Sequence, residues 1–238
     1  MKSPPPSATL IEPGADSPVS GQVRVWDLPV RLFHWLLVLL LAVSWYTGKT
    51  GGVYEMTWHM WSGYALLGLL LFRIAWGVMG SSSARFSQFL YGPRAMASYA
   101  NGLVRRRPSQ YFGHTPLGGW MTVAMLISLL VQVGTGLFAN DDILTEGPLM
   151  SWVNKSTSDW LTTIHYFNFN VLLTLAGVHV AAVLYYALAL RENLVWPMFT
   201  GVKKLRAGQT PPEFRFVGLG AAVVVGGAVA LAVYTLVG

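Results

Sequence analysis

The sequence predicts an all-α membrane protein, because it is poor in charge, rich in apolar residues and divided into long apolar segments. Only 11% of its 238 residues are charged and the mean hydropathy is +0.48, whereas a soluble domain carries about a quarter charged residues. Five segments are each long enough to cross a hydrocarbon core about 30 Å thick, which takes about 20 helical residues. These predicted spans are 28–48, 58–79, 117–139, 160–190 and 217–237.

The regions around the spans differ in composition. Residues 1–22 contain three consecutive prolines and lack the apolar core and cleavage site of a secretory signal, so we expect a disordered cytoplasmic tail. Residues 93–107 begin with proline and mix apolar with basic residues, which predicts either an interfacial helix or a solvated basic face. The span at 160–190 is long enough to tilt or to project from the lipid.

Positive charge is distributed unevenly across the predicted topology. Fourteen of the sixteen Lys and Arg residues fall on one side of the five spans, and only Lys49 and Lys155 fall on the other. By the positive-inside rule the N-terminus is cytoplasmic and the C-terminus lies outside. Topology thus explains the pI near 9.7, and nucleic acid is not an expected partner. The absence of Cys excludes disulfides, iron–sulfur clusters and covalent haem attachment.

Four of the five histidines, His34, His59, His165 and His179, lie inside or at the edge of predicted spans. Ionisable side chains at membrane depth are costly and usually functional. His165 and His179 are 14 residues apart, so they leave one helix face about 21 Å apart along the axis. The alternating directions of the spans place His34 with His179 at an inner level, and His59 with His165 at an outer level. Two imidazoles from different helices at one level are what a six-coordinate haem iron requires, so the pattern predicts two haem sites.

The same 14-residue spacing assigns further residues to the two levels. Gly48 reaches the outer level, where Gly63, Gly134 and Gly136 also fall, and the missing side chains would give a flat macrocycle room. Close helix packing in lipid explains these glycines as well. Arg73 reaches the inner level, where its guanidinium would pair with haem propionates or extend to the inner headgroups.

Three other candidate ligands are assigned to different roles. His114 lies just before the third span and outside its apolar run, so we expect it at the surface or at the start of that helix. Met56 and Met60 flank His59 and could offer a thioether. Because the histidine pairs already fill both axial positions, the two methionines are expected to be apolar filler.

In combination, these features resemble the bacterial cytochrome b561 and nickel–iron hydrogenase b-type cytochrome superfamily. The resemblance covers about residues 23–206 and is carried by residues 26–35 (WDLPVRLFHW), 59–63 (HMWSG), 113–118 (GHTPLG) and the His165 to His179 pair. It implies a four-helix transmembrane bundle holding two non-covalent b haems, with the axial ligands at the four histidines named above. The chain departs from the family in having His-Thr-Pro where many members have His-Asn-Pro, and in its fifth span.

Residues 207–238 are therefore read as a linker and an extra transmembrane helix beside the di-haem domain at 23–206. Small residues recur every fourth position in this helix, at Gly218, Ala222, Gly226 and Ala230. Such a stripe suits close contact with the chain's own bundle, with another protein or with a second copy of the chain.

The predicted function is that of a di-haem cytochrome b in the bacterial inner membrane, carrying electrons between the quinone pool and a periplasmic partner. We expect an electron-transfer subunit rather than a stand-alone catalyst, because bis-histidine iron has no open coordination position. It would either anchor a periplasmic hydrogenase-like oxidoreductase or oxidise quinol and reduce a soluble cytochrome or small oxidant. A rival hypothesis is a non-redox transporter or channel whose histidines bind a metal ion.

Two regions are candidates for contact with these partners. Asp27, Arg31 and Trp35 could meet a quinone near the inner haem, although an anchor at the inner surface explains the two charged residues equally well. Residues 140–159 carry four carboxylates against Lys155. This loop would steer a basic periplasmic partner or simply stay solvated.

Overall fold

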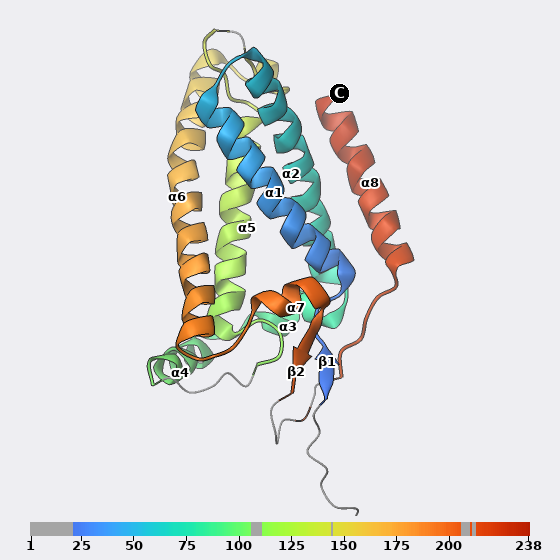
Figure 1. Ribbon diagram of the computed structural model, residues 1–238. Coiled ribbons are helices and arrows are strands. Elements are labelled where there is room, and N and C mark those ends of the chain that lie inside the picture. Colours follow the sequence, from blue (N-terminus) through green and yellow to red (C-terminus); the bar gives the residue numbers. More distant parts are fainter. Residues whose placement is uncertain (1–20, 106–110, 144, 206–209, 211–212) are drawn as a thin grey trace, which may run out of the picture.

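The structure is a computed structural model that describes residues 21–105, 111–143, 145–205, 210 and 213–238. Five long helices dominate it (Figure 1). All five are long and apolar enough to cross a membrane, which confirms the predicted fold class. They are α1 (Leu28–Thr50), α2 (Val53–Met79), α5 (Pro116–Gly136), α6 (Lys155–Leu188) and α8 (Leu219–Val237).

Local signals set where the spans begin. The side chains of Asp27, Thr115 and Asn154 each accept a hydrogen bond from the backbone N–H three residues later, which caps α1, α5 and α6. Proline in the first turn of α1 and of α5 fits the same positions. The turn between α1 and α2 contains Gly51 and Gly52 at φ values of 68° and 101°, which residues other than glycine rarely adopt.

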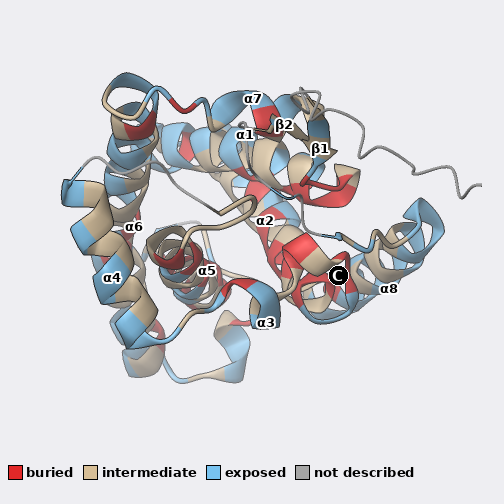
Figure 2. Cartoon of the chain, turned by 90° about the horizontal axis from the view of Figure 1, so that it is seen from below, coloured by how far each residue is buried: buried red, intermediate tan, exposed pale blue. Residues whose placement is uncertain are grey.

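The long helices pack as two hairpins. Helix α1 packs on α2 and α5 packs on α6, while α8 lies along α2 (Figure 1). The core between them is apolar and includes Leu37, Leu70 and Leu129, and Val233 of α8 is buried with it. Viewed along the bundle, buried residues face inward and much of the outer surface is exposed (Figure 2). Because that exposed surface is largely apolar, it suits a lipid environment.

Short elements close the end of the bundle that carries the N-terminal strand, which we call the inner end. Strand β1 (Gln22–Arg24) pairs antiparallel with β2 (Val202–Lys204), which follows α7 (Val195–Thr200). Between α2 and α5 lie η1 (Ser82–Ala84), α3 (Phe86–Phe89) and α4 (Pro93–Val104). The opposite, outer end holds the turn after α1 and η2 (Met150–Trp152).

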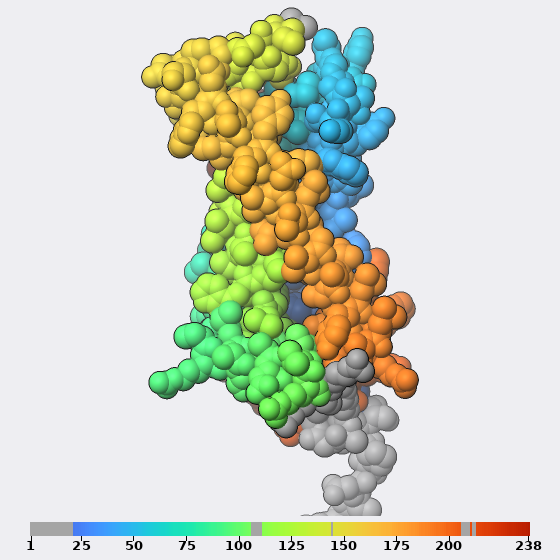
Figure 3. Space-filling model, turned by 90° about the vertical axis from the view of Figure 1, so that its left-hand side faces the viewer, coloured from blue at the N-terminus to red at the C-terminus, as the bar shows by residue number. Residues whose placement is uncertain are grey.

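Helix α4 confirms that a helix begins at Pro93, and it ends before the basic residues 106–107, which lie outside the described range. Hydrogen bonds tie it to the inner end of α6, where the hydroxyls of Tyr99 and Tyr186 pair and Tyr185 donates to the carbonyl of Leu103 at 3.1 Å. Figure 3 shows α4 beside the lower end of α6. Of the expected disordered tail, residues 1–20 lie outside the described range, and Gln22 already belongs to β1.

Candidate functional site

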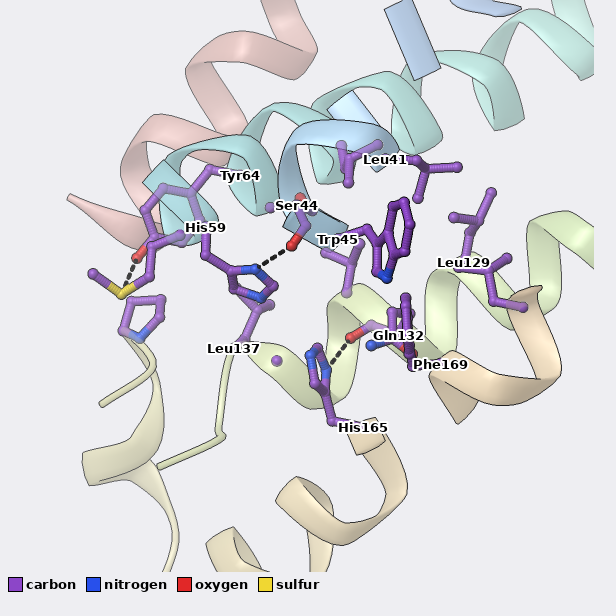
Figure 4. A pocket seen from close by; sticks show the side chains of 17 residues that line it. Leu41, Ser44, Trp45, His59, Tyr64, Leu129, Gln132, Leu137, His165 and Phe169 are labelled. Carbon is purple, nitrogen blue, oxygen red and sulfur yellow. Dashed lines mark hydrogen bonds between the residues drawn. The ribbon is translucent and has the colours of Figure 1, made fainter. Parts of the chain in front are cut away.

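Two histidines from different hairpins face each other near the outer end. His59 of α2 and His165 of α6 have ring centroids 6.1 Å apart and ring planes inclined by 78°. Both line a largely apolar cavity with residues such as Leu41, Trp45 and Phe169 (Figure 4). Two imidazoles that bind one metal ion from opposite sides through bonds of about 2 Å have centroids about 6 Å apart. The donor set and the spacing therefore fit one bis-histidine iron.

Each of these imidazoles is held by a backbone carbonyl. The Nδ1–H of His59 donates to the carbonyl of Ser44 at 2.9 Å, and the Nδ1–H of His165 donates to the carbonyl of Gln132 at 2.8 Å. Because a carbonyl only accepts, the proton is on Nδ1 and the lone pair of Nε2 is free to bind a metal. Fixing the ring through its second nitrogen is what orients a histidine ligand.

In both hairpins a glycine follows the residue with the accepting carbonyl by four positions. Gly48 lies four residues after Ser44, and Gly136 lies four residues after Gln132. A Cβ on Gly48 would lie 2.8 Å from Nδ1 of His59, and one on Gly136 would lie 3.0 Å from Cε1 of His165. The glycines thus let each imidazole pass the following turn of helix and approach the carbonyl.

A threonine precedes each of these glycines, and the two threonines make equivalent hydrogen bonds. The hydroxyl of Thr47 donates to the carbonyls of Val43 and Ser44, and that of Thr135 donates to those of Val131 and Gln132. The repeated Thr-Gly dipeptide was a signal present in the sequence, and sequence reasoning missed it together with the roles of the two carbonyls.

Polar contacts also join the two helices of each hairpin beside its histidine. In the first hairpin the hydroxyls of Ser44 and Ser62 lie 2.6 Å apart. In the second, the Asn168 amide donates to the side-chain oxygen of Gln132 at 2.8 Å and to the carbonyl of Ser128 at 2.9 Å. Interhelical hydrogen bonds of this kind hold transmembrane helices in register.

The glycines predicted to lie at the outer level differ in what surrounds them. Gly48 lies against the imidazole of His59, so it makes room for that ring. Gly63 lines the cavity, and a Cβ there would meet nothing within 4 Å. The described residues that line the cavity include Gly136 but not Gly134.

The second histidine pair lies at the inner level. His34 of α1 and His179 of α6 are close enough to interact electrostatically. Nδ1 of His34 is buried and has no hydrogen-bond partner, in contrast to both outer histidines. The indole of Trp35 packs edge-on against the His34 ring, with centroids 4.8 Å apart.

Unpartnered polar atoms gather at this inner end. In the part of the chain that the structure describes, five buried side-chain nitrogen or oxygen atoms have no hydrogen-bond partner. All five lie at the inner end: Nε of Arg31, Nδ1 of His34, Nη1 of Arg73, Oγ of Ser83 and Nδ1 of His114. A buried polar atom without a partner costs about 1–3 kcal/mol, so this end is suited to receive polar groups that the chain does not supply.

Among these residues, Arg73 carries a buried positive charge. It is only 2% exposed, and its guanidinium lies over the ring of Phe86 at 4.9 Å. Within the described ranges no ion pair joins it to a carboxylate. A buried cation without an anion is strongly destabilising, so the site fits a negatively charged group such as a haem propionate.

His114 directly precedes Thr115, the cap of α5, as the helix-start prediction expected, but its ring is packed inside the inner end rather than free at the surface. Its ring packs between those of Phe89 and Trp26, with centroid distances of 4.1 and 4.8 Å. Burial, with a further contribution from the charges of Arg73 and His179, lowers the pKa of His114 to about 3, so the imidazole is neutral. Its aromatic neighbours come from distant segments, which the sequence around position 114 does not reveal.

The three residues considered for quinone contact are engaged within the chain. Asp27 accepts hydrogen bonds from the Trp76 indole at 2.8 Å and from a backbone N–H of α1 at 2.9 Å. Trp35 donates to the carbonyl of Met198 at 3.1 Å, and Arg31 donates to that of Phe199. These contacts fasten α1 to α2 and α7.

The acidic loop at the outer end is partly neutralised by its own structure. Lys155 forms ion pairs with Asp142 at 2.5 Å and with Asp159. Asp141 accepts hydrogen bonds from the backbone N–H groups of Ile143 and Thr145. Glu146 is exposed. The described residues contain no group of three or more histidines or carboxylates arranged to hold a metal ion.

Comparison with known proteins decides the family. The model of the family described as prokaryotic cytochrome b561 matches residues 25–201, which include both histidine pairs. The chain belongs to the prokaryotic cytochrome b561 family. The match confirms the family identified from the sequence and favours a cytochrome over the transporter hypothesis. Membership makes the protein a multi-pass membrane b-type cytochrome, a class that carries haem b and transfers electrons.

Two curated relatives of this b561-family protein are similar over most of their length. A probable Ni/Fe-hydrogenase B-type cytochrome subunit from Rhizobium leguminosarum bv. viciae is 25% identical over 215 residues, covering 75% of this chain and 87% of the relative. The corresponding protein of Bradyrhizobium diazoefficiens is 22% identical over 216 residues, covering 77% and 87%. No solved structure gives a significant match.

Proposed function

We propose that this cytochrome holds two b haems and moves electrons through the membrane between a quinone and a periplasmic redox partner. The observation that carries the proposal is the His59 and His165 pair, with ring centroids 6.1 Å apart and each ring fixed by a backbone carbonyl. The inner pair, His34 and His179, comes from α1 and the same helix α6. A single long helix would thus supply one ligand to each haem.

Each part of the chain then has a defined task. When bound, the haems supply one-electron redox chemistry. The four imidazoles would hold the two irons, and an iron held by two histidines has no open coordination position for a substrate. The carbonyls of Ser44 and Gln132 make the outer imidazoles more basic ligands, which stabilises the oxidised state. Arg73 would provide the positive charge beside the inner haem that its propionates require.

The relatives narrow the choice of partner. Both are named as hydrogenase cytochrome subunits, so we favour a membrane anchor for a hydrogenase-like oxidoreductase over a stand-alone quinol oxidase. The concentration of Lys and Arg on one side supports an orientation with the inner end in the cytoplasm and the outer end in the periplasm. Electrons would then be exchanged with the partner at the outer haem and with quinone in the membrane.

A haem count on the purified protein tests the proposal. Pyridine haemochrome spectra combined with protein determination should give two b haems per chain, and iron analysis should give the same ratio. One haem per chain would overturn the di-haem assignment. Reduction of the haems by a quinol analogue in detergent tests the quinone, and co-purification of a periplasmic oxidoreductase with the tagged cytochrome tests the choice of partner.

A further inference from the structure

Two of the inner side chains with an unpartnered atom lie near the same aromatic ring, that of Phe89. The ring of Phe89 lies 4.1 Å from the His114 imidazole, between centroids, and 6.0 Å from Cζ of Arg73. The two polar side chains come from different parts of the sequence, Arg73 from α2 and His114 from the segment before α5. Both Nη1 of Arg73 and Nδ1 of His114 are buried without a partner.

The surroundings of His114 define what it can offer. Phe89 covers one side of the ring, and Trp26 packs against it at 74° with a centroid distance of 4.8 Å. The pKa of His114 is lowered to about 3, so the ring contributes a hydrogen bond and no charge. A neutral imidazole donates one hydrogen bond through whichever nitrogen carries its proton.

Of the described carboxylates, Glu213 lines a cavity with His114 and Asp27 lies near Arg73, but neither pairs with the two unpartnered atoms. Asp27 is 1% exposed and accepts hydrogen bonds on both oxygens, from Val30 and from the Trp76 indole. It influences Arg73 electrostatically but forms no ion pair with it among the described residues. Because no described residue supplies a partner for these two atoms, the place fits an acceptor carried by a bound group.

We propose that His114 and Arg73 together hold one propionate of the inner haem, His114 by a neutral N–H donor and Arg73 by its charge. The inference rests on the proposed function, because it requires a haem bound by His34 and His179. Proximity supports it, since His179 and Arg73 both act electrostatically on His114. A carboxylate can accept from two donors at once, and it supplies the anion that the buried guanidinium lacks.

His114 is thus a positioning residue that sets the charge on the edge of the inner haem. A propionate held by two donors presents less negative charge to the iron than one held by Arg73 alone. Loss of the His114 donor should therefore stabilise the ferric state and lower the potential of the inner haem. The outer haem, which His59 of α2 and His165 near the other end of α6 would hold, should not respond.

The test compares His114→Phe, which keeps an aromatic ring and removes the donor, with His114→Gln, which keeps an N–H donor. Both are titrated potentiometrically in detergent with optical detection, and a His34→Ala variant identifies the spectrum of the inner haem. Phe112→Leu, which alters the same segment without changing a polar group, serves as the matched control.

In His114→Phe we expect about a tenfold higher ratio of oxidised to reduced inner haem at a fixed potential, equivalent to 59 mV for a one-electron couple. His114→Gln should recover most of this shift, and Phe112→Leu should match the native protein. Loss of the inner haem from His114→Phe but not from His114→Gln would also support the proposal. Equal effects of the two His114 variants, or an unchanged inner potential in His114→Phe, would overturn it. A native protein with fewer than two haems would instead contradict the proposed function itself.

Discussion

The outer and inner histidine pairs differ in how completely the chain satisfies them. At the outer pair, both Nδ1 atoms donate to backbone carbonyls and the two rings already stand 6.1 Å apart. At the inner pair, Nδ1 of His34 has no partner, and four further buried polar atoms of the inner end share that condition. The protein therefore preforms the outer pair, whereas a cofactor at the inner pair, as proposed, would complete its hydrogen bonds and balance its charge.

The difference follows from how each site is built. The outer site uses the same device twice, a carbonyl exposed one turn before a glycine in each hairpin. The inner site lies where α1, α2, α6 and several short elements converge, and its polar groups come from distant segments. A carbonyl partner fixes the direction of a ligand, while a buried cation and a neutral donor fix the position of an anionic edge. We infer that the outer site controls ligand geometry and the inner site controls charge.

Removal of an axial histidine should have the largest effect and would separate the two sites. His59→Ala or His165→Ala should remove one haem, and His34→Ala or His179→Ala the other, each leaving about half of the haem in a pyridine haemochrome assay. Difference spectra should sort the four variants into two pairs. If His34→Ala and His59→Ala removed the same haem, the division into inner and outer pairs would be wrong.

Substitution of the hairpin glycines should weaken the outer site alone. A Cβ on Gly48 would lie 2.8 Å from the His59 ring, closer than van der Waals contact permits, and one on Gly136 would lie 3.0 Å from the His165 ring. Gly48→Ala and Gly136→Ala should therefore reduce occupancy of the outer haem and leave the inner haem in place. Occupancy is measured from optical spectra after purification.

Gly134→Ala is the matched control for these variants, because a Cβ there would meet nothing within 4 Å. It changes glycine to alanine in the same helix as Gly136 without touching a histidine. Full occupancy in Gly48→Ala and Gly136→Ala, or an equal loss in the control, would show that the close approach of glycine and imidazole does not hold the outer site together.

Hydropathy predicts the spans well, and the spacing of histidines predicts the sites only in part. Hydropathy over a window is a local property, so all five spans could be predicted, although α2 begins at Val53 rather than at 58 because Glu55 and other polar residues lower the hydropathy of its first turns. The 14-residue spacing of histidines on one helix likewise needs only helical geometry.

What the sequence could not predict depends on contacts between distant segments. The strands β1 and β2 pair residues about 180 positions apart, and three-residue strands leave no detectable pattern. For His114 the nearby helix start was predictable, but its packing on the rings of Trp26 and Phe89 was not. The position of Gly48 near the outer end of its helix was predictable. Its contact with the His59 ring was not, because that contact depends on how α1 and α2 pack.

Removal of the Arg73 charge should shift the potential of the inner haem without affecting the outer one. A buried positive charge favours the reduced iron, so Arg73→Leu should lower the inner potential, and Arg73→Lys should restore part of the difference. Redox titration of both variants beside the native protein measures the effect. A shift confined to the outer haem would contradict the placement of Arg73 at the inner site.

The smallest effect is expected at the outer surface, where electrons would pass to a partner. Asp142 is paired with Lys155, whereas exposed Glu146 forms no ion pair within the described residues. Long-range steering depends on net charge, so Asp142→Asn and Glu146→Gln should slow electron transfer to a basic soluble cytochrome by similar factors of about two or less at low salt. Raising the ionic strength from about 0.1 M to 1 M shortens the Debye length from about 10 to 3 Å and should abolish both effects.

Stopped-flow measurements with the native protein and both variants would decide between two roles for this loop. Equal, salt-sensitive losses would indicate that the outer end attracts its partner through net charge, while the geometry of the outer haem stays unchanged in optical spectra. Rates that respond neither to salt nor to the substitutions would show that the loop does not steer the partner. The Lys155 ion pairs would then serve only to stabilise the loop. Partner recognition would then rest on apolar contact, as expected for a tightly bound oxidoreductase subunit.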